Sequence, residues 1–337
     1  MRFEEFIGNQ AVIGRLRTRL REGRFPHGLL FAGPDGVGKR TCAIMLAKAL
    51  NCTESGPDDF CDTCAQCRKI DAGVHADVQF VRPEDESSSI RIQQIRQLLE
   101  TLHLRPLEGR HKVYIIDPAD AMNDAASNAL LKGLEEPPDD TSFILVTSNP
   151  QALLVTVRSR SQTYSFGPLT LAELRSFSSD ELALRSARGS IGFLKSLDLP
   201  TLKQRRDAAL EFLEIAIQAK EEQFGEMISA GGDLARSKTE FSPYLNSLAI
   251  LLEDVLYIRE GLSSRIVNID LEPRLQKLAE AIPPDQFTRV ADFLRTIEIY
   301  LERNVNRQML TDALALSSNA VVQEMAKIGN DNPAKSR

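Results

Sequence analysis

Short apolar runs alternate with helical patterns along the first half of the chain. Between residues 28 and 166, continuous hydrophobic runs are bounded by Gly, Pro, Asn or Asp, as buried parallel strands tend to be. These runs are HGLLFAG, DVQFVRP, HKVYIIDP, TSFILVTSN and QTYSFGP. Helical spacing fills the gaps, as in KRTCAIMLAKAL and in IRIQQIRQLLETL, where Ile92, Ile95, Leu99 and Leu102 share one face. The pattern predicts an α/β domain with a parallel sheet over residues 1–166.

The strand signal ends at Pro168, and the rest of the chain predicts helices. Residues 167–200 predict short helices that form a small domain. Residues 201–327 carry a series of longer amphipathic helices, more than one small sheet needs as a cover. We therefore expect residues 201–327 to form a helical oligomerisation domain, and residues 328–337 to form a polar tail.

Composition excludes several classes of protein. Of the 337 residues, 42% are hydrophobic and 26% are charged, as in ordinary globular proteins, and the length allows two or three domains. The formal net charge of −6 argues against a chain that grips nucleic acid alone through a broad basic face. No apolar run approaches a membrane span, and MRFEEFIGNQ does not resemble a signal peptide. The cysteines lie in one short stretch, unlike a disulfide framework, so we expect a cytoplasmic protein.

Four of the cysteines predict a metal site in a polar loop. Cys61, Cys64 and Cys67 have the spacing C-x-x-C-x-x-C, and Cys52 lies upstream across NCTESGPDDFC. Four thiolates at this spacing suit a closed, structural Zn²⁺ site that pins a loop too polar to fold by burial. An iron–sulfur centre and four unrelated thiols are the alternatives, although iron–sulfur runs often carry a following proline. Cys42, in mid-helix, is expected in the core.

The stretch GPDGVGKRT predicts a phosphate-binding loop with one departure. The pattern is matched at Gly33, Gly38 and Lys39, and Gly36 is a further glycine of the same loop and a candidate nucleotide contact. They follow a predicted strand and open a predicted helix, the setting in which backbone N–H groups cradle an anion. Arg40 stands where Ser or Thr would hold Mg²⁺. Thr41 carries a hydroxyl one position later, roughly 100° further round the helix, and remains a candidate nucleotide contact only.

The cysteine insertion behind this loop, together with SNALLKGLEEPP at residues 127–138, resembles the bacterial DNA polymerase III clamp-loader subunits of the AAA+ family. FEEFIGNQAVIGRLRTRL and HGLLFAGP resemble the family's N-terminal segment and first strand. TSFILVTSNP is similar to its sensor-1 strand, and TVRSRSQ to its Ser-Arg-Cys motif, with Ser161 in place of the cysteine. NVNRQMLTDALAL resembles the last helix of the delta-prime type. The resemblance implies a small helical lid over residues 167–200 and a helical collar over residues 201–327.

The positions at which this chain departs from the family's pattern indicate which of the family's two subunit types it resembles. A motor subunit needs a metal ligand after the loop lysine and a carboxylate that polarises water. Here Arg40 replaces the ligand, and Pro118 follows Asp117 where the family has the base. Asp120 resembles the outer acid of the same box, and Gly192 stands at the position of the family's sensor-2 arginine. The absence of the family's catalytic side chains at Arg40, Pro118 and Gly192 is typical of the delta-prime type.

The resemblance also assigns the remaining positions. It implies that Asn149 is sensor 1 and that Arg160 is a trans arginine finger, which reaches the ATP of a neighbouring subunit. Lys39 and Asp117 are implied to contact nucleotide, and binding of ATP or ADP is left open. Implied partners are motor (gamma/tau) and delta subunits in a hetero-oligomeric ring, which acts on a sliding clamp and primed DNA.

Three hypotheses for the function follow. In the first, the chain belongs to a DNA-directed DNA polymerase holoenzyme and helps load its clamp, with weak or absent hydrolysis of its own; whether it is itself an enzyme is left open. The second is an ATP-hydrolysing motor subunit of the gamma/tau type. The third is a zinc-stabilised nucleic-acid binder, which the net acidity disfavours.

Overall fold

The computed structural model describes residues 2–23, 25–56, 58–84, 89–218 and 238–281. The chain divides into two compact units. The first unit comprises Met1–Ser179 and Ala187–Ser196, and the second comprises Asp180–Ser186 and Leu197–Arg337. Each unit is described by itself. Within the described ranges, every helix is too short or too polar to cross a bilayer.

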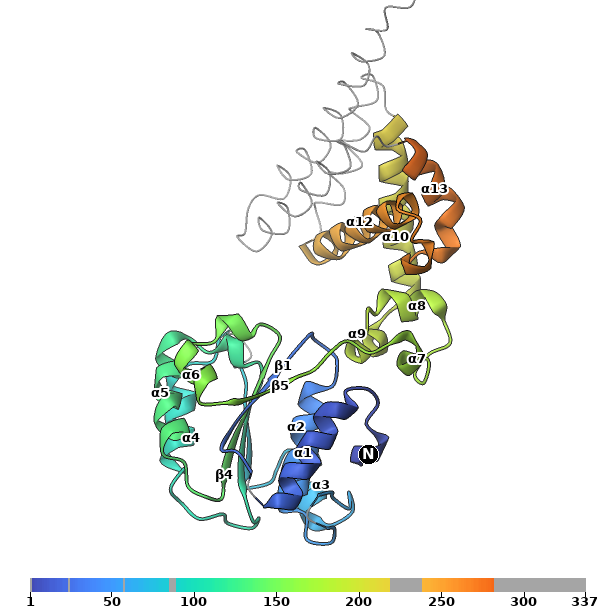
Figure 1. The fold of residues 1–337 in the computed structure, drawn as a ribbon. Helices are drawn as coiled ribbons and strands as arrows, with labels where there is room; N and C mark the ends of the chain where they lie inside the picture. Colours follow the sequence, from blue (N-terminus) through green and yellow to red (C-terminus); the bar gives the residue numbers. More distant parts are fainter. Residues whose placement is uncertain (1, 24, 57, 85–88, 219–237, 282–337) are drawn as a thin grey trace, which may run out of the picture. The chain divides into compact units, whose positions relative to one another are not determined.

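A parallel sheet forms the centre of the first unit (Figure 1). Its strands in the described part of the chain are β1 (Gly28–Ala32), β2 (Val78–Val81), β3 (Lys112–Ile116), β4 (Thr141–Thr147) and β5 (Gln162–Ser165), in the order β2-β3-β4-β1-β5. All neighbouring pairs are parallel. Each strand lies in one of the predicted hydrophobic runs, so the predicted α/β fold with a parallel sheet is confirmed. The loops after β1, β3 and β4 meet at one edge, because parallel strands share the direction of their carboxyl ends.

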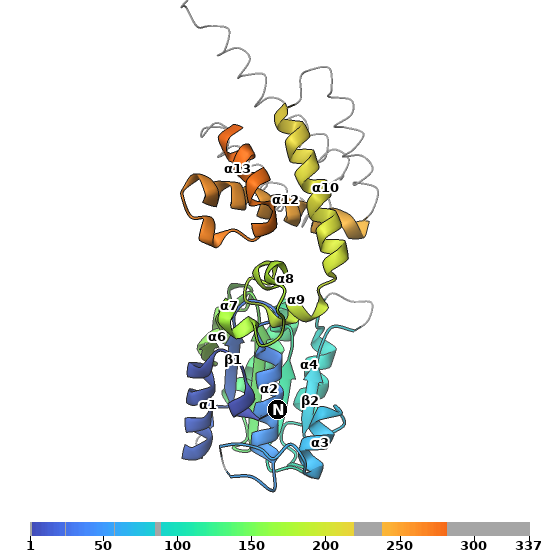
Figure 2. The ribbon, with the colours of Figure 1, turned by 90° about the vertical axis from the view of Figure 1, so that its right-hand side faces the viewer.

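Helices cover both faces of this sheet (Figures 1 and 2). Those of the first unit are α1 (Gln10–Glu22), α2 (Lys39–Asn51), α3 (Ala65–Asp71), α4 (Ile92–Glu100), α5 (Asp124–Glu135), α6 (Val155–Ser159), α7 (Leu171–Leu174) and α9 (Ile191–Ser196). Single turns occur at η1 (Phe3–Glu5), η2 (Ala119–Ala121) and η3 (Pro150–Ala152). α1, α2 and α3 lie on one face and α4, α5 and α6 on the other. With both faces covered, the strands bury their side chains throughout β1, β3 and β4, which explains their continuous hydrophobic runs.

The apolar face of α4 is shifted slightly from the predicted one. Ile95, Leu98 and Leu102 are buried against the sheet, whereas Ile92 and Leu99 are only partly buried. The buried set is spaced i, i+3, i+7, so it follows the helical period equally well. Leu98 was missing from the predicted face.

The second unit is helical. It contains α8 (Glu181–Ser186), α10 (Leu199–Gln218), α12 (Lys238–Arg259) and α13 (Glu272–Ala281), with single turns at η5 (Ser263–Arg265) and η6 (Ile269–Leu271). α12 packs against both α10 and α13. The buried Asp254 of α12 accepts hydrogen bonds from the backbone N–H groups of Val267 and Asn268, at 2.7 and 2.8 Å, and so fixes the turn before α13. The predicted helical C-terminal region is confirmed in its described residues, which are 199–218 and 238–281. The helices predicted at residues 284–304 and 306–316, and the tail at 328–337, lie outside the described residues.

Candidate functional site

The phosphate-loop sequence lies between β1 and α2, at the carboxyl edge of the sheet. Gly38 caps the amino end of α2 with a left-handed backbone, φ 95°. A Cβ atom there would lie 2.8 Å from Cζ of Phe6, so the loop passes directly against the N-terminal segment. Only glycine combines this backbone conformation with so close an approach.

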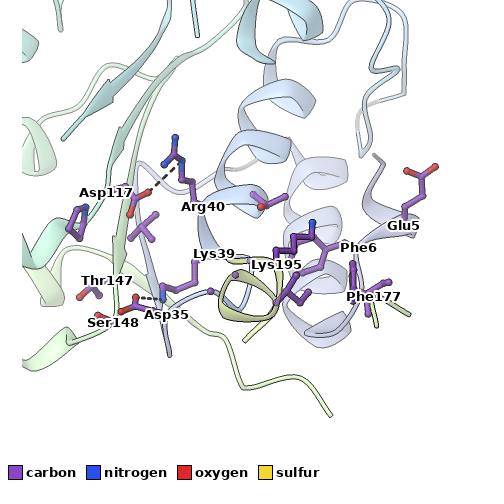
Figure 3. A pocket seen from close by; sticks show the side chains of 18 residues that line it. Glu5, Phe6, Asp35, Lys39, Arg40, Asp117, Thr147, Ser148, Phe177 and Lys195 are labelled. Carbon is purple, nitrogen blue, oxygen red and sulfur yellow. Dashed lines mark ion pairs between the residues drawn. The ribbon is translucent and has the colours of Figure 1, made fainter. Parts of the chain in front are cut away.

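Lys39 is held by its own loop. Its side chain is 5% exposed, and Nζ donates to the carbonyl oxygens of Gly33 and Pro34, both at 2.6 Å. Nζ also lies 3.6 Å from a carboxylate oxygen of the exposed Asp35 (Figure 3). Burial lowers the pKa of Lys39, and the Asp35 carboxylate acts in the opposite direction. The lysine side chain is therefore held inside its own loop by two backbone carbonyls.

Arg40 forms an ion pair where a metal would be expected. Its Nε lies 3.7 Å from Oδ2 of Asp117, the residue that follows β3 (Figure 3). Burial raises the pKa of Asp117, while the nearby guanidinium groups of Arg40 and Arg82 act to lower it. Mg²⁺ requires oxygen ligands, and a guanidinium offers none. The residues present therefore do not fit the magnesium site of a hydrolytic phosphate loop.

A cavity of about 420 Å³ opens beside this pair. Its wall includes most of the predicted nucleotide contacts, Gly36, Gly38, Lys39, Thr41 and Asp117. Sequence patterns gave no signal for several other wall residues, because segments distant in the sequence bring them there: Phe6, Ile7, Phe177, Ile191 and Lys195. The volume falls within the range of small-molecule sites.

The segment carrying α9 touches the phosphate loop through glycine. The N–H of Gly192 donates to the carbonyl of Gly36 at 2.9 Å. A Cβ atom on Gly192 would lie 2.8 Å from Cα of Gly36. The position at which the family has its sensor-2 arginine therefore has no room for a side chain in this conformation, and Lys195, one turn later on α9, lines the cavity instead.

The predicted sensor-1 residue lies beside the cavity. Asn149 is exposed, and its backbone N–H donates to Oγ1 of Thr147 at 3.0 Å. The same hydroxyl donates to the carboxylate of Asp120. Val146 and Thr147 of β4 and Ser148, which follows β4, are on the cavity wall, and Asn149 is not among the wall residues.

The four predicted metal ligands come together. The sulfur atoms of Cys52, Cys61, Cys64 and Cys67 all lie within 4.8 Å of one another. A tetrahedral zinc–thiolate site with bonds of about 2.3 Å places its sulfurs about 3.8 Å apart, and Cys52 Sγ lies 4.0 Å from Cys64 Sγ. The N–H groups of Cys61 and Cys64 donate to the sulfurs of Cys52 and Cys61, at 3.3 and 3.1 Å, as suits thiolates. The donor set thus fits a closed, structural Zn²⁺ site.

Charged and aromatic side chains hold the cysteine loop against α2 and the N-terminal segment. The buried Lys48 of α2 donates to carboxylates of Asp62 and Asp71, both at 2.5 Å. Phe60 of the loop packs edge-on against Phe3, with ring centroids 5.4 Å apart. Cys52 itself ends α2, so the same helix that begins at the phosphate loop ends at the cysteine cluster.

Arg160 lies at the amino ends of the strands, whereas the phosphate loop lies at their carboxyl ends. Its carbonyl oxygen would be 2.6 Å from a Cβ atom on Gly28, the first residue of β1. Its guanidinium is 37% exposed and pairs with Glu135, at the end of α5, at 2.7 Å. β1 separates the two edges by roughly 13 Å at the usual rise per residue. Arg160 is therefore directed away from the cavity of its own chain.

Comparison with known proteins identifies the family. The family model described as "DNA polymerase III, delta subunit" matches residues 8–170. DNA polymerase III subunit delta' of Bacillus subtilis is 32% identical over 315 residues, which cover 90% of this chain and 94% of that protein. The chain belongs to the delta-prime family of DNA polymerase III subunits.

The chain is also similar to longer proteins. The tau subunit of Escherichia coli is 30% identical over 318 residues, 84% of this chain. The chain spans only 48% of that protein's length, and 30% of the tau subunit of Bacillus subtilis, which is 37% identical over 169 residues. Coverage of both sequences thus favours the delta-prime relative over the tau relatives.

Proposed function

We propose that this chain is the delta-prime subunit of a bacterial clamp loader, and that it supplies Arg160 to the ATP site of a neighbouring subunit. In this proposal the chain joins motor (gamma/tau) and delta subunits in a cytoplasmic ring that loads a sliding clamp onto primed DNA. It does not itself hydrolyse ATP at a useful rate.

The position of Arg160 carries this proposal. A half-exposed arginine at the amino edge of the sheet, opposite its own phosphate loop, can meet a phosphate only on another chain. The departures at Arg40 and Pro118 support the second part, because no oxygen ligand directly follows the loop lysine and no carboxylate directly follows Asp117. We further propose that Cys52, Cys61, Cys64 and Cys67 hold one structural zinc ion.

Steady-state ATP hydrolysis by a reconstituted loader tests the arginine. Arg160→Ala should slow the one motor site that receives this side chain by roughly 10³–10⁵-fold, so the loader should lose that site's share of its clamp- and DNA-stimulated turnover. Arg158→Gln is the matched control, since Arg158 lies two residues away and pairs within its own chain with Gln151, at 2.6 Å. Equal turnover of the two variants would show that Arg160 is not a finger.

Single-turnover hydrolysis by the isolated chain tests the second part. A motor subunit would turn over its bound ATP, whereas this chain should give no more phosphate than the Lys39→Ala variant. Hydrolysis above that level would favour the gamma/tau type of function.

A further inference from the structure

The residues of the phosphate-loop site do not fit magnesium, but the Arg40 side chain can perform part of the role of the metal. In a hydrolytic site, Mg²⁺ neutralises the carboxylate that follows the third strand and binds phosphate oxygens. Here the Arg40 guanidinium, Nε 3.7 Å from Asp117 Oδ2, already neutralises that carboxylate. A guanidinium has five N–H donors, so pairing with one carboxylate oxygen leaves donors for phosphate.

Asp117 is not a free metal ligand in this arrangement. Its side chain is 17% exposed and lies within the influence of Arg40, Arg82 and Lys39, all of which favour its ionised form against the opposing effect of burial. A divalent ion entering the site would have to displace Arg40 and sit close to a fixed positive charge, which is electrostatically unfavourable.

The cavity wall also carries a third cationic side chain, from α9. Lys195 lies on α9, one turn beyond Gly192, and its Nζ lies 5.5 Å from the centroid of the Phe177 ring. Among the described residues, the cationic side chains on the wall are therefore Lys39, Arg40 and Lys195. Two of them come from the phosphate loop and α2, and the third from the segment that is hydrogen-bonded to Gly36.

The carboxylates of Glu5, Asp35 and Asp117 also line the wall, and the apolar part of the wall suits the organic part of a nucleotide. Phe6, Ile7, Phe177 and Ile191 give it an apolar side. The backbone N–H groups at the amino end of α2, with Lys39, give it an anion-binding side. With about 420 Å³ of space, the cavity can accommodate one nucleoside polyphosphate.

We propose that this cavity binds a nucleoside di- or triphosphate without magnesium, and that the Arg40 guanidinium takes the place of the metal. Binding exchanges the two carbonyl acceptors of Lys39 for phosphate oxygens, and Lys195 supplies the cation that the sensor-2 position lacks. Because Arg40 and Pro118 offer neither a metal ligand nor a base, the nucleotide is held intact. The proposal concerns a different site from Arg160, so either can fail without the other.

Binding of fluorescently labelled ADP to the full chain tests this proposal, measured in Mg²⁺ and again in excess chelator. The natural chain should keep its affinity within about threefold on chelation. Arg40→Thr restores the hydroxyl of a hydrolytic loop, so its affinity should fall at least tenfold on chelation. Arg40→Gln should lose at least tenfold in both buffers, because it has neither charge nor metal ligand.

Arg96→Gln is the matched control, since Arg96 is an exposed arginine on α4 outside the cavity wall. It should bind as the natural chain does. Equal thermal unfolding midpoints establish that each variant is folded. Binding by the natural chain only in Mg²⁺, or no binding at millimolar nucleotide, would overturn the proposal.

Discussion

At the scale of single residues, His111 is expected to lower the folding stability of the first unit at acid pH. It precedes β3, and its Nε2 shares a hydrogen bond of 2.9 Å with Oγ of Ser142. Burial lowers the pKa of His111 to about 4; the Asp140 carboxylate opposes this shift and His27 adds to it. In the unfolded chain the imidazole titrates near pH 6.5. Between the two values the unfolded chain binds a proton that the folded chain does not.

We therefore predict that His111 makes the first unit less stable as the pH falls from 6.5 towards 4, by up to about 3 kcal/mol, because the depressed pKa favours unfolding in acid. Urea unfolding at pH 7 and pH 4.5 measures this. His111→Gln should lose less stability between the two pH values than the natural chain, and His103→Gln, at an exposed histidine, should behave as the natural chain does. Equal acid sensitivity of all three proteins would contradict the prediction.

At the scale of elements, α2 joins two candidate sites. Its 13 residues run from Lys39 to Asn51, and Cys52 follows as the carboxyl cap. At 1.5 Å per residue, the phosphate loop and the cysteine cluster are about 20 Å apart. The cluster stabilises a polar loop, whereas α2 itself is buried against the sheet through apolar residues such as Leu46. Metal binding should therefore affect the loop far more than the helix.

We predict one zinc ion per chain by elemental analysis. Removal of zinc by a chelator should speed amide hydrogen exchange between Cys52 and Cys67 and leave exchange in the sheet strands unchanged, because the sheet has its own core.

Substitutions of cysteine give the matched comparison. Cys64→Ser should abolish the bound zinc, whereas Cys42→Ala, at a fully buried cysteine in mid-helix, should retain it. Iron with visible absorbance, or a metal-free natural chain, would refute the zinc assignment.

At the scale of the whole molecule, the helical part is the proposed oligomerisation region. α10, α12 and α13 pack together within the second unit, which also includes α8. Arg185 of α8 donates to the carbonyl oxygens of Ser264 and Ile266, at 3.0 and 2.7 Å, so α8 belongs with the helices that follow. The first unit has a separate core around its sheet.

We predict that a chain ending at Leu199 keeps the fold of the first unit and fails to join motor and delta subunits. The physical reason is that the sheet and its covering helices precede this point, while α10, α12 and α13, the helices proposed to form the collar, lie from this point onward. Circular dichroism checks the fold, and gel filtration with the partner subunits checks the assembly. Co-elution of the shortened chain at full stoichiometry would place the interface in the first unit.

The sequence by itself determined the elements and the candidate residues of the sites. Buried parallel strands need continuous apolar runs, so the runs in the sequence locate β1 to β5. Local spacing likewise predicted the phosphate loop and the cysteine cluster, because each gathers its groups within a short segment. Arg40 departs from the phosphate-loop pattern itself, and Pro118 departs from the pattern of the family that the chain resembles.

Only the tertiary structure decided which residues from distant parts of the sequence contact these candidate residues. The pair between Arg40 and Asp117 joins residues 77 positions apart, and the contact of Gly192 with Gly36 joins residues 156 positions apart; neither leaves a local pattern. Lys195 and Phe177 reach the cavity wall for the same reason. The placement of Arg160 at the far edge of the sheet depends on strand order, which brings β5 beside β1. Pairings between distant segments are set by packing of the folded chain, and a sequence period records only which side of an element is apolar.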